Sequence, residues 1–246
     1  DHVITTSMEH NSVLRPLKSL EKFGITHSVL RADRDGLLTA ADIEKTIRPN
    51  TKLIIVTAAS NVTGGKMPIA EIGELAKRKG IFFMVDGAQG AGCMPLDVAH
   101  MHIDMLAFPG HKGLLGPQGS GGLYASPRTA LRPMLEGGTG TESKSREQPR
   151  EFPEGFEAGT INAPAIIGLG RGTEFVAKIG VDVIARYEEE LISYLDACLD
   201  EMPGVLRYGP PAGKKTGITL FNIEGLPAEE VTATLNNQYG IAVRGG

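Results

Sequence analysis

The sequence has few of the features that mark secreted, membrane or nucleic-acid-binding proteins. It contains two cysteines in 246 residues, too few for a disulfide framework. No apolar run approaches the roughly 20 residues of a membrane span. No basic tract accompanies the net charge of -4, so we expect neither a membrane nor a nucleic acid as a partner. These absences predict a cytoplasmic protein that acts on a small molecule or on another protein.

The residues that are present predict an α/β protein. Apolar residues make up 41% of the chain, which is enough for a hydrophobic core. Strand-like and helix-like segments alternate through the first two thirds, a pattern typical of a mostly parallel, doubly wound sheet. Thr39 is expected to cap one helix, Gly80 to end a helix that begins at Pro68, and residues 163–179 to form another helix. Residues 136–153 show no periodicity and are expected to form a long, functional loop.

A smaller α+β unit is predicted after residue 180. A long amphipathic linking helix is expected over residues 181–202, because apolar side chains recur there at steps of three and four: Ile184, Tyr187, Leu191, Leu195, Cys198 and Met202. Strands over 205–208, 217–223 and 241–244 and a helix over 227–239 should follow. We therefore predict a large domain over residues 1–180 and a partial small domain over residues 181–246. Both ends of the chain adjoin strand-like segments, so we expect a fragment of a longer protein.

Two strand-like runs end on residues that carry chemistry. The run Phe82-Phe83-Met84-Val85 ends on Asp86, and a second run, over residues 104–108, leads to Lys112 between glycines. Ligands bind beyond the carboxyl ends of the strands in open α/β sheets, so Asp86 and Lys112 are expected at one edge. A carboxylate and an amine placed there suit pyridoxal phosphate. The amine can bind the cofactor aldehyde, and the carboxylate can keep the ring nitrogen protonated.

Four motifs extend this pattern along the chain: Met8-Glu9-His10-Asn11-Ser12, Val85-Asp86-Gly87-Ala88-Gln89, Gly110-His111-Lys112-Gly113-Leu114-Leu115-Gly116-Pro117 and Phe156-Glu157-Ala158-Gly159-Thr160. Together and in this order they resemble the class V aminotransferases, and most of all their cysteine desulfurase and selenocysteine lyase branch. The resemblance implies the fold type I architecture of pyridoxal phosphate enzymes, with a large domain and a smaller, here incomplete, C-terminal domain. It also implies pyridoxal 5'-phosphate as the cofactor and a homodimer as the working form.

The resemblance further implies catalytic and cofactor-binding roles. Lys112 would hold the cofactor covalently and move protons at the substrate, and His10 would stack on the cofactor ring as a second catalytic group. Asp86 would pair with the ring nitrogen. Gln89 and Asn61 would contact the phenolic oxygen, and His111 would bind the phosphate.

Substrate and partner contacts are implied in the same way. Arg244 would clamp the carboxylate of an amino-acid substrate, since a bidentate guanidinium suits that group, and Asn61 would also contact the substrate. Thr160 would reach the phosphate in the partner subunit, so that the site is complete only in a homodimer.

The match to the family has three departures. Pro109 stands where many desulfurases have a hydroxyl residue that helps to hold the phosphate. The glycine-rich phosphate cradle of the family lies ahead of the part matched by Asp1, and its nucleophilic cysteine follows the position matched by Arg244. Neither Cys93 nor Cys198 matches that nucleophile.

The predicted function is a pyridoxal phosphate-dependent reaction on a small amino acid. The full-length form would be cysteine desulfurase-like, removing sulfur from cysteine to leave alanine, with a sulfur-acceptor protein as a further partner. The alternatives are transamination, epimerisation or β-elimination, or an inactive fragment that serves as a structural or interaction module. No metal site is expected, because Asp33-Arg34-Asp35-Gly36 lacks the spacing of a calcium loop and His100 and His102 have no clustered partner ligands.

Overall fold

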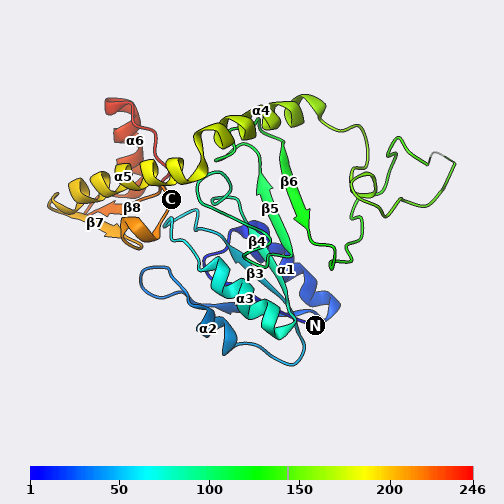
Figure 1. Ribbon diagram of the computed structural model, residues 1–246. Helices are drawn as coiled ribbons and strands as arrows, with labels where there is room; N and C mark the ends of the chain where they lie inside the picture. Colours follow the sequence, from blue (N-terminus) through cyan, green and yellow to red (C-terminus); the bar gives the residue numbers. More distant parts are fainter. Residues whose placement is uncertain (143, 246) are drawn as a thin grey trace.

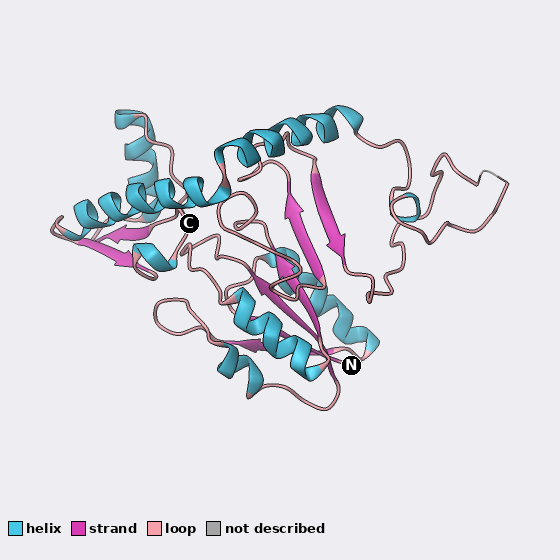
Figure 2. Ribbon diagram, viewed as in Figure 1, coloured by secondary structure: helices cyan, strands magenta, loops and turns pink. Residues whose placement is uncertain are grey.

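A computed structural model describes residues 1–142 and 144–245 and shows an α/β fold (Figures 1 and 2). Its main sheet has the strand order β2-β1-β3-β4-β5-β6. The strands are β1 (His2–Thr6), β2 (Thr26–Leu30), β3 (Thr51–Thr57), β4 (Phe82–Asp86), β5 (Met105–Pro109) and β6 (Gly121–Ala125). Neighbouring strands are parallel except for β5 and β6, which pair antiparallel. The expected mostly parallel sheet is therefore confirmed.

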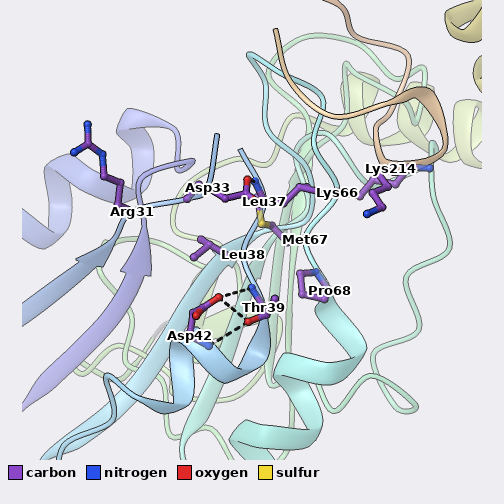
Figure 3. Close-up of a pocket in the computed structure, with 11 residues that line it drawn as sticks. Arg31, Asp33, Leu37, Leu38, Thr39, Asp42, Lys66, Met67, Pro68 and Lys214 are labelled. Carbon is purple, nitrogen blue, oxygen red and sulfur yellow. Dashed lines mark hydrogen bonds between the residues drawn. The ribbon is translucent and has the colours of Figure 1, made fainter. Parts of the chain in front are cut away.

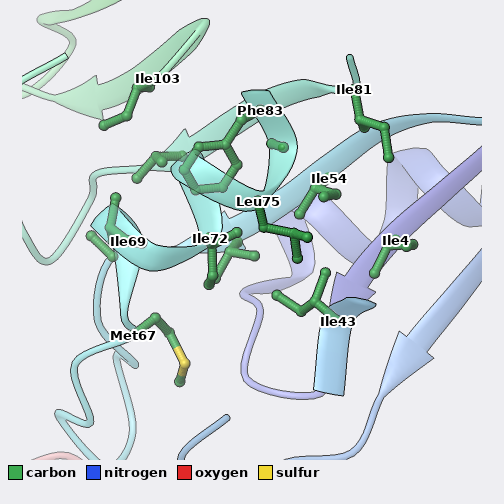
Figure 4. Close-up of a cluster of buried hydrophobic side chains, with 14 of the residues drawn as sticks. Ile4, Ile43, Ile54, Met67, Ile69, Ile72, Leu75, Ile81, Phe83 and Ile103 are labelled. Atoms are coloured by element: carbon green, nitrogen blue, oxygen red, sulfur yellow. The ribbon is translucent and has the colours of Figure 1, made fainter. Parts of the chain in front are cut away.

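Helices cover both faces of this sheet. α2 (Ala40–Glu44) and α3 (Ile69–Lys79) lie on one face, and α1 (Asn11–Leu20) lies on the other. The larger core fills the space between the sheet and α3, where Ile54, Ile72 and Phe83 are completely buried (Figure 4). Burial of each such side chain contributes about 1.5–3 kcal/mol. A smaller cluster around Leu17 lies beneath α1.

Local sequence signals set the ends of these helices. The Thr39 side chain accepts the N–H of Asp42, and the Asp42 carboxylate accepts the N–H of Thr39, which together form a capping box at the start of α2. α3 follows Pro68 and ends at Gly80, which takes the left-handed conformation with a φ of 67°. The structure thus confirms the predicted Thr39 cap and the predicted Gly80 terminus.

The rest of the chain forms a second group of elements. It contains α4 (Ala163–Ile179), α5 (Val181–Asp200), β7 (Val205–Tyr208), β8 (Leu220–Ile223) and α6 (Ala228–Tyr239). β7 and β8 form a separate antiparallel pair that lies with α5 and α6 at one end of the molecule, whereas the long segment between β6 and α4 projects from the other end (Figure 1). No helix in the described part of the chain is long and apolar enough to span a membrane.

Three predictions for the C-terminal region were wrong in detail. Residues 241–245 are not a strand, because no neighbouring strand in the described chain pairs with them. The strand expected from residue 217 begins at Leu220, since the backbone of Lys215 and Thr216 pairs instead with residues 64 and 65. α5 buries Ile192, Asp196 and Leu199 rather than the predicted stripe, which leaves Tyr187, Leu191, Leu195 and Met202 exposed.

Candidate functional site

A cavity of about 540 Å³ lies at the carboxyl ends of the central strands. The last residue of β4 and the turns after β1, β3, β4 and β5 supply six of its polar lining residues: His10, Asn61, Asp86, Gln89, His111 and Lys112. Val13, Met84 and Phe108 contribute apolar walls. Six of the eight residues named from the sequence therefore line one cavity. The two that do not, Thr160 and Arg244, are exposed elsewhere on the molecule.

Asp86 is held at its place by the sheet and by the turn that follows it. It is the last residue of β4 and pairs in register with Thr57 of β3 and Ala107 of β5. Its Oδ1 accepts the N–H of Ala88 at 2.9 Å. This bond fixes the orientation of the half-buried carboxyl group at the edge of the cavity.

Lys112 lies in a tight loop between β5 and β6. The N–H of Leu115 donates to the Lys112 carbonyl at 2.9 Å, and the N–H of Gly116 donates to the Gly110 carbonyl at 2.7 Å. Gly113 lets this loop touch the turn after β4, because a Cβ there would come within 2.5 Å of the Ala91 carbonyl oxygen. The turn that follows Asp86 is thus in direct contact with the loop that carries Lys112.

His10 also begins a helix, which the sequence reasoning missed. Its Nδ1 accepts the N–H of Ser12 at 3.2 Å and caps α1. In the neutral imidazole this bond leaves the proton on Nε2. The cap therefore orients the ring and sets its tautomer at the rim of the cavity.

Glu9, which lies between the cavity residue His10 and the end of β1, was also missed. The carboxyl group of Glu9 is buried and accepts hydrogen bonds from the Thr6 hydroxyl at 2.7 Å and from the N–H of Thr57 at 3.0 Å. Burial raises the pKa of Glu9 to about 7; the bonds from Thr6 and Thr57 oppose this rise, and the charge of Asp86 adds to it. The available signal was a glutamate placed next to His10 directly after an apolar strand.

The cysteines lie outside the cavity. Cys93 packs behind the Lys112 loop, and a Cβ on Gly113 would come within 2.6 Å of its Sγ. Burial raises the pKa of the Cys93 thiol to about 11, and Glu188 acts in the same direction. Cys93 is therefore a thiol rather than a thiolate at neutral pH. Cys198 is half-buried in α5.

A second cavity of about 550 Å³ lies between the loop after β2 and the start of α3 (Figure 3). Its acidic groups are already bonded: Asp42 caps α2 with Thr39, and Asp33 accepts the N–H groups of Asp35 and Leu37. None of the eight residues to which the sequence analysis assigned a catalytic, cofactor or substrate role lines it. The cavity at the strand ends, which holds six of those eight residues, is therefore the candidate site.

Comparison with known proteins identifies the family of the chain. The model of a family described as Aminotransferase class-V matches residues 1–246. A probable cysteine desulfurase of Methanothermobacter thermautotrophicus is 36% identical over 250 residues, which cover 100% of this chain and 62% of that protein. A cysteine desulfurase of Enterobacter sp. is 36% identical over 252 residues, covering 100% of this chain and 61% of that protein.

A solved structure gives the same result in three dimensions. The apo structure of a cysteine desulfurase from Thermococcus onnurineus NA1 superposes with a TM-score of 0.92 at 37% sequence identity. The match covers 99% of this chain and 62% of that one. The chain thus spans about 62% of the length of the relatives that it resembles.

Proposed function

The chain belongs to the class V aminotransferase family, and on that premise we propose that its full-length protein is a pyridoxal 5'-phosphate-dependent cysteine desulfurase. The family depends on this cofactor. The observation that carries the proposal is the placement of Asp86, Lys112 and His10 around one cavity. Cysteine would be the substrate, its sulfur would pass to a cysteine thiolate as a persulfide, and alanine would be released. A sulfur-acceptor protein would then take the sulfur.

The residues of the cavity fit the cofactor by chemical type. A volume of about 540 Å³ is within the range of small-ligand sites. The Asp86 carboxylate would face the ring nitrogen, the Lys112 amine would hold the aldehyde carbon, and the imidazole of His10 would pack against the ring. Gln89 and Asn61 offer amide donors for the phenolic oxygen, and His111 offers a donor for the phosphate.

The chain's own residues would divide the work of the reaction. When bound, the cofactor supplies a ring that accepts electrons from the substrate carbon. Asp86 stabilises positive charge on the ring nitrogen by an ionic hydrogen bond. Lys112 lines the same cavity and would carry the proton to and from the substrate carbon. Asn61 would contact the substrate, and Arg244, brought to the cavity in the complete protein, would bind the substrate carboxylate.

We also propose that the site is completed in a homodimer. Thr160 is exposed and lies just before α4, where the long segment that follows β6 returns to that helix (Figure 1). From there its hydroxyl would reach the phosphate in the partner subunit.

The test uses the lysine that the proposal requires. Addition of pyridoxal phosphate to the full-length protein should produce a yellow species that borohydride bleaches, with the added mass on the peptide that contains Lys112. Lys112→Ala should abolish the colour and the added mass, because Lys112 is the only lysine among the described residues that line the cavity. Lys178→Ala, at an exposed position on α4, should retain both. A Lys112→Ala protein that still carries borohydride-fixed cofactor would contradict the proposal.

One observation favours a second reaction. Neither Cys93 nor Cys198 lines the cavity, and the Cys93 thiol is protonated at neutral pH. A family reaction that needs no thiolate, such as β-elimination, would use the same Lys112. Product analysis with cysteine separates the two, because desulfuration yields alanine whereas β-elimination yields pyruvate and ammonia.

A further inference from the structure

Glu9 has a buried oxygen that the fold alone does not explain. The residue is only 7% exposed, and its Oε1 accepts both hydrogen bonds, from the Thr6 hydroxyl and from the N–H of Thr57. Its Oε2 is buried and has no hydrogen-bond partner among the described residues. An ionised carboxylate in this position would be costly, because a buried charge needs a partner. The geometry instead fits a neutral carboxyl group whose proton is on Oε2.

Glu9 connects two strand ends that both border the cavity. Through the peptide bond it precedes His10, the first cavity residue after β1. Through its side chain it holds Thr57, which lines the cavity and pairs in register with Asp86. The Thr57 hydroxyl in turn donates to the Ala59 carbonyl at 2.7 Å, where the chain turns toward Asn61.

We propose that Glu9 is a positioning residue whose buried carboxyl group ties the end of β1 to the end of β3 and so fixes His10 relative to Asp86 across the cavity. The effect of this link on cofactor binding rests on the proposed function. The link itself is a property of the folded chain. A neutral Glu9 also places no second negative charge near that of Asp86. The burial of Glu9 and the nearby charge of Asp86 both favour that neutral form.

Two substitutions separate the link from its charge. Glu9→Gln keeps an acceptor oxygen for Thr6 and Thr57 and is neutral at every pH, whereas Glu9→Leu removes the acceptor. The probes, read in the cofactor-free chain by NMR, are the hydrogen-exchange rate of the Thr57 amide and the ring resonances of His10. Glu224→Gln, at an exposed position outside any helix, is the matched control.

We expect Glu9→Gln and the control to keep both probes near their wild-type values. In Glu9→Leu the Thr57 amide should exchange about tenfold faster, as expected when one hydrogen bond is lost, and the His10 resonances should shift. If Glu9→Leu does not fold, Thr6→Val, which removes one of the two donors, should move both probes in the same direction. Unchanged probes in Glu9→Leu, or in Thr6→Val if Glu9→Leu does not fold, would overturn the proposal.

Cofactor affinity distinguishes this proposal from the proposed function. Titration of the full-length protein with pyridoxal phosphate should give about tenfold weaker binding in Glu9→Leu and wild-type binding in Glu9→Gln. If the wild-type protein binds no cofactor while the NMR probes respond as stated, the proposed function fails and the Glu9 link stands. If Lys112-dependent binding is the same in wild-type and Glu9→Leu, the Glu9 proposal alone fails.

Discussion

For single residues, burial and neighbouring hydrogen-bond donors together set the pKa values of the acidic groups. The Glu9 carboxyl is buried and the Cys93 thiol is half-buried near the strand ends, and loss of solvent raises the pKa of each, to about 7 and about 11. Asp104 shows the opposite balance at the start of β5. Burial works to raise its pKa, but hydrogen bonds from Arg128 and from the N–H of Phe83 outweigh this effect and lower it. The difference arises because Arg128 pairs with Asp104, whereas no cation in the described part of the chain pairs with Glu9.

Glu9 predicts how stability changes with pH. Its pKa is about 7 in the folded chain against 4.5 ordinarily, so the folded state keeps a proton that the unfolded state releases. The stabilisation is complete below pH 4.5 and is lost as pH rises through 7. The loss amounts to about 3 kcal/mol, at 1.36 kcal/mol per pKa unit.

Urea unfolding at pH 5 and pH 8 measures this pH-dependent loss of stability. The free energy of unfolding should fall more steeply with pH in the wild-type chain than in Glu9→Gln, which cannot ionise. Glu224→Gln should follow the wild-type slope, since its side chain is exposed. Parallel slopes for the wild type and Glu9→Gln would show that Glu9 titrates alike in the folded and unfolded chains.

At the scale of elements, glycines let α4 approach the loop that carries Lys112. A Cβ on Gly172 would lie 2.2 Å from the Leu114 carbonyl oxygen, and a Cβ on Gly168 would lie 2.6 Å from Pro117 Cγ. Gly170, on the same helix, has no atom within 4 Å of that position. The Gly168-Leu169-Gly170-Arg171-Gly172 run is therefore a packing surface rather than a phosphate-binding motif.

This contrast predicts opposite effects for two substitutions on one helix. Gly170→Ala should stabilise the protein by about 0.5–1 kcal/mol, because it removes glycine from an open helix position. Gly172→Ala should destabilise it by about 2 kcal/mol and weaken cofactor binding, because α4 or the Lys112 loop must move. Chemical denaturation and cofactor titration measure the two effects. Equal stability of the two variants would show that α4 does not press on this loop.

At the scale of the whole molecule, one buried lysine lies where the two groups of elements meet. Lys215 Nζ contacts Asp196 Oδ2 at 2.7 Å and the Thr219 hydroxyl at 2.6 Å. Its neighbours along the chain join the loop after Asn61, since the N–H of Lys66 donates to the Lys214 carbonyl at 2.9 Å. We propose that residues 181–246 form a small domain and that this junction holds it against the large domain of residues 1–180.

The junction predicts a large cost for losing Lys215. Lys215→Met should destabilise the protein by about 3 kcal/mol, because Asp196 stays buried and loses its closest cation. Lys18→Met should cost at most about 1 kcal/mol, although the Lys18–Glu21 pair is also short at 2.6 Å, since both of its side chains are exposed. Urea unfolding of both variants provides the comparison. If the Lys215→Met protein were as stable as the Lys18→Met protein, Lys215 would not hold the two groups of elements together.

Predictions succeeded where the signal is local. The Thr39 cap, the Gly80 terminus and the bounds of α4 all depend on neighbouring residues in the chain, and the structure confirms them. Predictions failed where a distant segment decides. Residues 241–244 have the composition of a strand but no partner strand among the described residues. The exposed apolar stripe of α5 is not the face that packs on β7.

The order of the elements and the chemical groups at the strand ends follow from the sequence alone, because alternation, caps and strand termini are properties of short segments. Two features depend on segments that are distant in the chain, which only the folded structure brings together: six of those groups share one cavity, and loss of solvent raises the pKa values of Glu9 and Cys93. The physical reason is that solvation and hydrogen bonding of a side chain depend on what packs against it. For Glu9 that neighbour is Thr57, which the chain reaches only two strands later.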